Sequence, residues 1–560
     1  MKIKYLLLIA TILMGQAAFC CTNFLCTRGA SKDGSTIITY AADSHTRYGQ
    51  LRFCPAKDHA AGEMLRVYDY GSMKFHLEIP QPAHTYQVVG FINEFQLAIG
   101  ETTFGGRKEL EHGNANGIDY GSLIYITLQR AKNAREAIKV MDELTKTYGY
   151  ASGGESFSIA DPDEVWIMEI IDKGDEQGAV WVARRVPEGY VCGHANQSRI
   201  TTFPLEQKKS YTSISSKNMK YINKPEVECV YAEDVITFAK KHGFYTGKDE
   251  DFSFADVYNP LTFSGMRACD ARVYAMFNRV NSNMKQYEDY AMGYNKENRM
   301  PLWIKPDRKL DVQDIMSLMR DHYEGTPMDM TQDVGAGPFH LPYRWRPMDF
   351  EVDGQKYVHE RAISTQQTGF SFVAQCRKGF PNKVGGILWF GVDDTYSTVY
   401  CPMFCGINQV PTCFEEGNGS MSEYSETAAF WLFNRVTNFC YLRYDVMIKD
   451  VQRVQKELED QFVQDVDRVS KRAAEIDNDA RLTGLLNHFS NDAAELMMRK
   501  WKELDNFLLV RYIDGNIKKV ENGKFKTTET GVVAYPDQPA YPDWYYRGIA
   551  DQHGDVVKVK

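Results

Sequence analysis

The sequence predicts an α+β protein in which two layers of strands each carry companion helices. Strand-like segments gather in two blocks, one in about the first 200 residues and one at about 362–402, and helical segments lie between and after them. Strands and helices do not alternate one by one, as they do in a doubly wound parallel sheet. This grouping therefore favours an α+β sandwich.

The first block opens with a hairpin at residues 22–43. "TNFLCT" and "TIITYAAD" have strand-like composition, and the "KDGS" at 32–35 between them is a turn signal. Two further short strands are predicted on either side of the Asn93-Glu94 turn. Residues 122–150 are predicted to be helical, because they carry an apolar stripe formed by Ala134, Ala137, Ile138, Met141 and Leu144.

The remaining elements follow the same two patterns. Strands are predicted at 155–171 and 178–197, and "VQDIMSLMRDHYEG" predicts a helix that ends near Gly325. Residues 451–476 form a strongly amphipathic helix, and 492–513 are predicted to form another. The apolar positions of the first lie at steps of three and four, at Val451, Val454, Leu458, Phe462, Val466, Val469, Ala473 and Ile476. We favour packing of these helices on the main body over a coiled coil with a partner.

The composition is globular and argues against several classes of function. The chain has 560 residues, of which 43% are hydrophobic and 25% charged, enough for one large domain or two to three smaller ones. A net charge of −9 disfavours a phosphate-binding surface, so nucleic-acid binding is not predicted. No later stretch of about 20 uninterrupted apolar residues occurs, so no membrane span is predicted.

The first 20 residues have the organisation of a secretory signal peptide. Two lysines supply the charged region, "YLLLIATILMG" the apolar core and "QAAFC" the cleavage region. With Ala18 and Cys20 as the small residues before the cut, cleavage falls between Cys20 and Cys21. We therefore predict an exported protein, periplasmic or extracellular. The alternative is a lipoprotein acylated on Cys20, which the bulky Phe19 disfavours.

Removal of this leader leaves an odd number of cysteines. The full chain has 12, so cleavage after Cys20 leaves 11. In an exported protein an odd cysteine suggests a free, reactive thiol. The other cysteines are able to pair in an oxidising compartment, with a connectivity that the sequence does not determine.

A mature chain that begins at Cys21 brings two reactive groups into one residue. The thiol is a nucleophile, and the α-amine, with an ordinary pKa of about 7.7–8.0, is able to accept the thiol proton. The predicted hairpin would hold this terminus in place, whereas most chain termini are mobile. The structural alternative is that Cys21 is half of a disulfide or a small buried apolar residue.

Other catalytic and metal-binding patterns are absent from the sequence. It contains no HExxH, P-loop, GxSxG or papain-like "CGSCW" segment, and no GxGxxG that opens a βαβ unit. No metal and no cofactor is predicted. Four scattered histidines lack metal-ligand spacing and are interpreted as structural or solvent-facing: His112, His194, His322 and His340.

The segment "CTNFLCTRGASKDGSTIITYAADSH" resembles the start of the dipeptidase A-type family of cysteine peptidases, which are N-terminal-nucleophile hydrolases. Other segments resemble blocks of that family in the family's order: "GFINEFQLAIGETT", "LQRAKNAREAIKVMDELTKTYGY", "GGESFSIADPDEVWIMEI", "WVARRVPEGYVCGHANQ", "MRDHYEGTP", "ERAISTQQTGFSFVAQCR" and "GGILWFGVDDTYSTVYCPM". They cover most of residues 21 to about 445, and their number makes the resemblance specific.

The resemblance implies a four-layer αββα sandwich with additional C-terminal helices, exposure of the cysteine by autocatalytic or leader-dependent cleavage, and hydrolysis of short peptides, mainly dipeptides. Cys21 would attack the scissile carbonyl. Asp43 matches an aspartate near the nucleophile's amine, Asn196 matches an oxyanion-hole asparagine, and Arg272 matches, less closely, an arginine near the cysteine. Asp43 or Glu101 is expected to hold the free ammonium group of a dipeptide.

Tyr40 departs from the family pattern, since relatives often carry an arginine three residues before the aspartate at position 43. If that arginine lowers the thiol pKa or holds a substrate carboxylate, Arg272 has to replace it here or nothing does. The structural alternatives are a turn-capping role for Asp43, a turn at a strand end for Asn196 and an ordinary salt bridge for Arg272.

The predicted domains are a signal peptide at 1–20, an N-terminal-nucleophile dipeptidase domain at 21–445, a helical extension packed on it at 446–512, and an irregular tail at 513–560. The expected partner is a dipeptide or short peptide, and a homo-oligomer is left open. Two other functions are kept as alternatives. One is an N-acyl amidase similar to bile-salt hydrolases, and the other is a non-catalytic exported binding protein.

Overall fold

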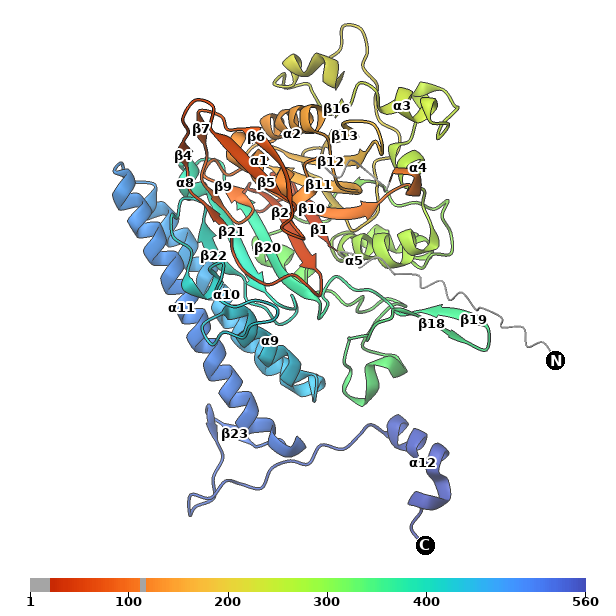
Figure 1. The fold of residues 1–560 in the computed structure, drawn as a ribbon. Helices are drawn as coiled ribbons and strands as arrows, with labels where there is room; N and C mark the ends of the chain where they lie inside the picture. The colour runs from red at the N-terminus through yellow and green to blue at the C-terminus, as the bar shows by residue number, and fades with distance from the viewer. Residues whose placement is uncertain (1–20, 111–116) are drawn as a thin grey trace, which may run out of the picture.

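The computed structural model describes residues 21–110 and 117–560 and is shown in Figure 1. The predicted leader, with Cys20, and His112 lie outside the described residues. The α+β prediction is confirmed, since strands in several sheets are combined with helices that precede, separate and follow them.

One of the two large sheets has seven strands in the order β17-β14-β1-β2-β20-β21-β22, and all its neighbours pair antiparallel. The predicted N-terminal hairpin lies near its centre as β1 and β2. The left-handed φ of Gly34 (+76°) lies in the connecting turn, where glycine has no Cβ to clash. The strands are β1 Asn23–Cys26, β2 Thr36–Asp43, β14 Val191–His194, β17 Trp303–Ile304, β20 Thr368–Cys376, β21 Gly386–Val392 and β22 Cys401–Phe404.

The other large sheet has nine strands in the order β15-β16-β13-β12-β11-β10-β9-β8-β3. Its pairs are antiparallel except β15 with β16. The strands are β3 Phe53–Cys54, β8 Val88–Val89, β9 Ile92–Asn93, β10 Ala98–Gly105, β11 Gly154–Ala160, β12 Val165–Asp172, β13 Ala179–Arg185, β15 Ser213–Ser215 and β16 Cys229–Tyr231.

The two large sheets pack against each other, with β2 of one in contact with β10 and β11 of the other. Between them the Tyr40 ring meets Phe91, Phe370 and Phe372 edge-on, with centroids 5.5–5.7 Å apart. Strands β2, β11, β12 and β20 are buried along their whole length. Both faces of each sheet are therefore covered, and apolar side chains on both faces suit such strands.

Helices cover the outer sides of these sheets. Helix α2 contacts β11, β12 and β13, while α9 contacts β21 and both α10 and α11 contact β22. Figure 1 shows α10 and α11 side by side along one flank of the molecule. The helices are α1 Tyr120–Arg130, α2 Ala134–Tyr148, α3 Val235–Lys241, α4 Phe254–Tyr258, α5 Ala271–Val280, α6 Glu288–Ala291, α7 Val312–Leu318, α8 Asn382–Gly385, α9 Ala429–Cys440, α10 Tyr444–Ala473, α11 Asp479–Tyr512 and α12 Asp543–Val557.

Four predicted helices differ from the structure. The helix expected at 451–476 is α10, Tyr444–Ala473, and the one expected at 492–513 is α11, which begins at Asp479. The single helix expected at 122–150 is divided into α1 and α2, because the Asn133 side chain accepts a hydrogen bond from the Glu136 N–H and caps a new helix. The helix expected to end near Gly325 ends at Leu318 instead. Tyr323, with φ of +65°, has a left-handed backbone that no α-helix can contain.

Smaller elements lie at the periphery. The hairpin of β18 (Asp349–Val352) and β19 (Gln355–Val358) is exposed throughout. Where an irregular tail is expected, the structure has a short hairpin and α12, whose two glycines weaken the helical signal in the sequence. Other short strands are β4 Lys57–Asp58, β5 Met64–Tyr68, β6 Phe75–Pro80, β7 His84–Thr85, β23 Val520–Glu521 and β24 Lys524–Phe525.

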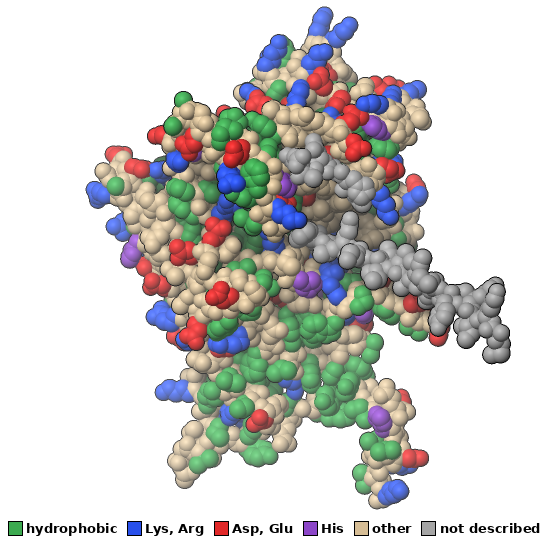
Figure 2. Space-filling view, viewed as in Figure 1, with side chains coloured by type: hydrophobic (Ala, Val, Ile, Leu, Met, Phe, Trp, Pro, Cys, Tyr) green, Lys and Arg blue, Asp and Glu red, His purple; other side chains and the backbone are tan. Residues whose placement is uncertain are grey.

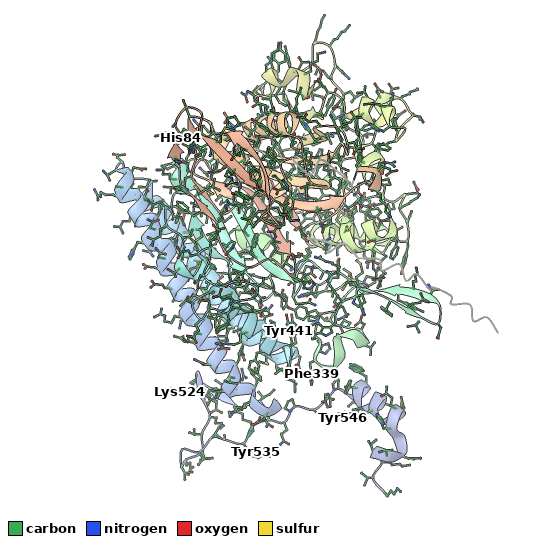
Figure 3. The ribbon with its side chains drawn as sticks, viewed as in Figure 1. His84, Phe339, Tyr441, Lys524, Tyr535 and Tyr546 are labelled. Atoms are coloured by element: carbon green, nitrogen blue, oxygen red, sulfur yellow. The ribbon has the colours of Figure 1, made fainter. Side chains whose placement is uncertain are left out.

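The C-terminal segment extends from the body and carries exposed aromatic side chains. Figure 3 labels Tyr535 and Tyr546 on it, and nearby Tyr541 stacks on Phe339 with ring centroids 5.6 Å apart. Figure 2 shows hydrophobic side chains gathered over the lower part of this face, while acidic and basic side chains are mixed above it. Among the described residues, no helix has the length and apolar character needed to cross a bilayer.

Candidate active site

Cys21 lies just before β1, between the two large sheets. Its neighbour Thr22 forms a β-bridge with Ala41, and Cys21 itself is only 3% exposed with a free thiol. The Sγ atom lies 3.8 Å from the Tyr40 hydroxyl and 3.7 Å from Glu101 Oε1, within hydrogen-bond range for sulfur. The Tyr40 hydroxyl also donates to Glu101 Oε1. The thiol, phenol and carboxyl groups thus form one buried cluster.

Arg272 connects Cys21 to Asn196. Its fully buried guanidinium donates from Nη1 to the Cys21 carbonyl oxygen at 2.6 Å and to Thr22 Oγ1 at 2.9 Å. From Nη2 it donates to Asn196 Oδ1 at 2.8 Å and to the Ala195 carbonyl at 3.1 Å. Arg272 lies in the first turn of helix α5, just after a π-helical turn at Gly265–Asp270, a local irregularity that is often found at functional sites.

Asn196 follows β14 and has φ of +61°. Asparagine tolerates this left-handed region better than most residues, which suits it to a sharp turn at the end of a strand. Its Nδ2 donates to the Thr103 carbonyl of β10 at 2.5 Å. The Asn196 side chain therefore lies between Arg272 and the nine-stranded sheet, on the same side of the molecule as Cys21.

Asp43 ends β2 and is engaged by protein groups at both carboxylate oxygens. Arg361 Nη2 donates to Oδ2 at 3.0 Å and the Thr368 hydroxyl donates to Oδ1 at 2.6 Å. Burial raises the pKa of Asp43, although Arg361 and Thr368 favour its charged form. Of the two residues expected to hold a substrate ammonium, Asp43 is thus occupied, while Glu101 has a buried Oε2 without a hydrogen-bond partner in the described residues.

The site disfavours a thiolate in the resting protein. Burial, followed by the carboxylates of Glu101 and Asp43, raises the pKa of the Cys21 thiol well above its usual range. Because a charged sulfur is disfavoured here, the nucleophile has to form by proton transfer to a base inside the site. Arg272 does not supply a contact with the sulfur in place of an arginine at position 40, since it binds the Cys21 backbone.

Glu155 and Arg361 belong to this site but were not predicted from the sequence. Glu155 lies on β11 opposite Thr103, whose hydroxyl donates to its Oε1 at 2.8 Å. One signal was present, because Glu101 and Glu155 each interrupt a strand made otherwise of apolar and small residues. Charged side chains are rarely fully buried without a reason. No such sequence signal indicated Arg361.

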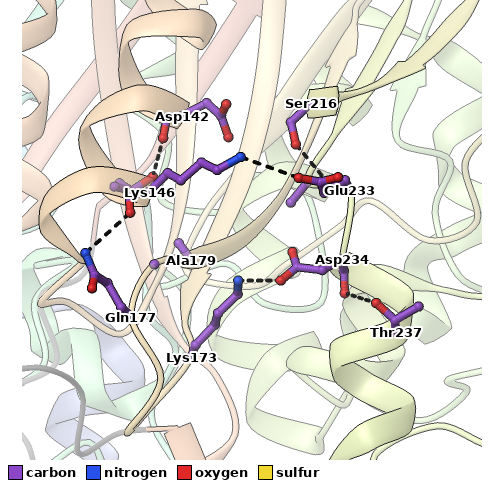
Figure 4. A pocket seen from close by; sticks show the side chains of 12 residues that line it. Asp142, Lys146, Lys173, Gln177, Ala179, Ser216, Glu233, Asp234 and Thr237 are labelled. Atoms are coloured by element: carbon purple, nitrogen blue, oxygen red, sulfur yellow. Dashed lines mark hydrogen bonds and ion pairs between the residues drawn. The ribbon is translucent and has the colours of Figure 1, made fainter. Parts of the chain in front are cut away.

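A separate polar cavity of about 320 Å³ lies on the surface beside α2 and β13, and none of its lining residues belongs to the Cys21 site. Its lysines are paired, Lys146 with Glu233 at 3.4 Å and Lys173 with Asp234 at 2.5 Å (Figure 4). Within residues 21–110 and 117–560, no group of three or more His, Cys, Asp or Glu side chains is arranged to hold a metal ion.

Comparison with known proteins places this chain in a family. The model of peptidase family C69 matches residues 20–88 and 79–457. A probable dipeptidase B from Streptococcus pyogenes serotype M1 is 22% identical over 82% of this chain and 86% of its own length. Probable dipeptidases from Latilactobacillus sakei and Salmonella dublin are 23% and 24% identical, over 74% and 72% of this chain and 79% and 85% of their own. The family resemblance seen in the sequence is confirmed: the chain belongs to peptidase family C69.

Proposed function

We propose that this protein is an exported cysteine dipeptidase whose nucleophile is Cys21, exposed as the mature N-terminus by removal of residues 1–20. The observation that carries the proposal is the convergence of Cys21, Asn196 and Glu101 on one buried site, joined through Arg272 and Tyr40. The family membership and the names of the relatives support a dipeptide substrate.

In the proposed mechanism the freed α-amine of Cys21 takes the thiol proton. The thiolate attacks the substrate carbonyl carbon, and Asn196 and a backbone N–H stabilise the resulting oxyanion. Collapse of this intermediate expels the amine product and leaves an acyl-enzyme, which water then hydrolyses. The raised pKa of the Cys21 thiol supports an internal base, because the sulfur does not ionise unaided near neutral pH.

The arrangement of the elements supports the finer fold and domain proposals. Two sheets in contact, with helices on their outer sides, suit the αββα layering of N-terminal-nucleophile hydrolases. The proposed catalytic domain covers 21–445, and 446–512 forms the helical extension packed on it. The segment 513–560 adds a peripheral tail.

The first experiment replaces Cys21 and compares the result with a matched cysteine. Cys21→Ala should abolish hydrolysis of a free dipeptide such as alanyl-leucine and leave the fold intact. Cys26→Ala is the control, because Cys26 is an equally buried free cysteine on the neighbouring strand β1. Dipeptide hydrolysis by Cys21→Ala at the wild-type rate would refute the mechanism.

The second experiment determines the mature N-terminus by intact mass and N-terminal sequencing of the exported protein. We expect a chain that starts at Cys21 with an unmodified amine. A chain that retains Cys20 with acyl chains would instead identify a lipoprotein, in which the Cys21 nitrogen stays an amide and is unable to act as the base.

A further inference from the structure

Two glutamates lie together beside the thiol, on adjacent strands of the nine-stranded sheet. Thr103 of β10 is directly opposite Glu155 of β11, and Glu101 lies two residues before Thr103 on the same strand. Successive side chains on a strand alternate between faces, so Glu101, Thr103 and Glu155 share one face. Of these, Glu101 contacts the thiol, with its Oε1 atom 3.7 Å from the Cys21 Sγ atom. The Glu101 and Glu155 residues are each 1% exposed.

The hydrogen bonding of this pair is incomplete. Glu101 Oε1 accepts from Tyr40 and Glu155 Oε1 accepts from Thr103, but Oε2 of each glutamate is buried and accepts no hydrogen bond from a donor in the described residues. Buried carboxylates are normally paired or fully hydrogen-bonded, because an unpaired buried charge is costly. The two carboxyl groups interact with each other. Because other donors are scarce around them, the pair is a candidate site for a cation.

A count of charges indicates which cation is missing. Burial raises the pKa of Glu101, while Tyr40, Glu155 and Arg47 favour its charged form. Burial and the Glu101 carboxylate raise the pKa of Glu155, so the two carboxyls share a proton when no ligand is bound. A ligand that brings one positive charge would replace that proton, which passes to solvent.

We propose that Glu155 acts with Glu101 to bind the free α-ammonium group of the peptide substrate, and that Tyr40 is a positioning residue that holds Glu101 beside the Cys21 sulfur. This inference rests on the proposed dipeptidase function and adds Glu155 as a residue that determines specificity. It also assigns Tyr40 a role at the position where the family often has arginine.

The distances fit an aminopeptidase-like register, with the bond between the first and second residues at the nucleophile. In an amino acid the nitrogen and the carbonyl carbon are separated by two bonds, about 2.5 Å from standard backbone geometry. A nucleophile approaches its carbon to about 3–3.5 Å before attack. An ammonium held by Glu101, whose Oε1 is 3.7 Å from Sγ, therefore places the first carbonyl carbon within reach of the sulfur.

The test compares alanyl-leucine with propionyl-leucine, which has the same carbon skeleton but lacks the ammonium group. Wild-type enzyme should favour alanyl-leucine by at least about 100-fold in kcat/KM. Glu155→Gln keeps an acceptor for the Thr103 hydroxyl and does not alter a contact of the sulfur. It should raise KM for alanyl-leucine by about 10- to 100-fold, the range expected for one charged hydrogen bond, with kcat changed less than about 3-fold.

Propionyl-leucine supplies the internal control, since its kcat/KM, or its inhibition constant where it is not turned over, should stay within about 3-fold in Glu155→Gln. Tyr40→Phe should lower the preference for alanyl-leucine in the same direction by loosening Glu101. Glu459→Gln is the matched variant, because it removes a buried carboxylate of α10 far along the chain and should leave the preference unchanged.

Three possible results distinguish a failure of this inference from a failure of the proposed dipeptidase function. If Glu155→Gln weakens both compounds equally, or neither, the glutamate pair does not bind the substrate ammonium and the inference is wrong, while the dipeptidase function stands. If wild-type enzyme cleaves propionyl-leucine as well as alanyl-leucine, the proposed dipeptidase function itself fails in favour of an N-acyl amidase, and the inference fails with it.

Discussion

Two buried glutamates in this protein have opposite surroundings. Glu459 of α10 receives Arg320 at both oxygens, at 2.6 and 3.1 Å, and also the Tyr400 N–H at 3.0 Å. Glu155 of β11 receives the Thr103 hydroxyl at one oxygen, faces a second carboxyl, and has an Oε2 with no donor in the described residues. Both are 3% exposed or less.

The comparison distinguishes a buried carboxylate that stabilises the fold from one that we propose binds a ligand. At the α10 contact, protein groups satisfy the carboxylate and fix a helix to the body. Between the sheets, the protein supplies two carboxyl groups and leaves their charge incompletely matched. Buried polar groups without full hydrogen bonding are common at binding and catalytic sites, where a ligand supplies the missing hydrogen bonds or the opposite charge.

The largest effect should come from breaking the completed pair. Glu459→Gln leaves Arg320, whose side chain is only 13% exposed, without its anion and should lower the free energy of unfolding by about 3 kcal/mol. Denaturant unfolding measures this. The double variant Arg320→Met with Glu459→Met should recover most of the loss, because neither charge then stays buried. A loss below about 1 kcal/mol in Glu459→Gln would show that the contact does not hold the helix.

A buried carboxylate with fewer partners, that of Asp393, should give an effect on stability that depends on pH and reaches a similar size only at high pH. Asp393 accepts from Asn434 Nδ2 at 2.9 Å, and burial raises its pKa to about 6. The folded protein thus holds this proton more tightly than the unfolded chain. Asp393 costs no stability below about pH 4, and its cost grows to about 3 kcal/mol as pH rises through 6, at 1.36 kcal/mol per pKa unit.

Asp393→Asn removes that cost and suits the left-handed backbone at this position, where φ is +66°. Thermal unfolding at pH 5 and pH 8 should show a smaller loss of Tm with rising pH than the wild type shows. Equal losses in the two proteins would mean that Asp393 ionises normally in the folded state.

The smallest effect is expected at the surface cavity of Figure 4. The Lys146–Glu233 pair joins side chains that are 66% and 44% exposed. Exposed pairs contribute little, so Lys146→Ala should change the free energy of unfolding by less than about 0.5 kcal/mol and leave dipeptide hydrolysis within about 2-fold. A large fall in activity would reveal a function for this cavity that its chemistry does not indicate.

The sequence predicted the α+β class and several elements because their signals are local. Strand-like composition and the turn at Gly34 predict β1 and β2, and regular apolar spacing predicts most of α10. The boundaries of α1, α2 and α7 were harder to predict. The start of α2 depends on one capping side chain, that of Asn133, and the left-handed backbone of Tyr323 prevents a helix from continuing to Gly325. The apolar periodicity of the sequence reveals neither feature.

The site was predictable only in part for a related reason. The family resemblance identified Cys21, Asn196 and Arg272 as separate motifs, and the structure brings them within hydrogen-bond distance of one another or of shared neighbours. The pairing of Glu101 with Glu155 depends on the register between β10 and β11, which are separated in the chain by two helices. No local pattern encodes that register, so the sequence could mark Glu155 as a charge within a strand but could not pair it with Glu101.

Arg272 has one more consequence. Its guanidinium ties the nucleophile's backbone to the side chain of Asn196, so helix α5 sets the spacing of the groups proposed to break the peptide bond. The groups proposed to recognise the substrate lie elsewhere, on β10 and β11. Substitutions at Glu155 on β11 could therefore change which molecules this enzyme accepts, while α5 keeps the spacing of the reacting groups.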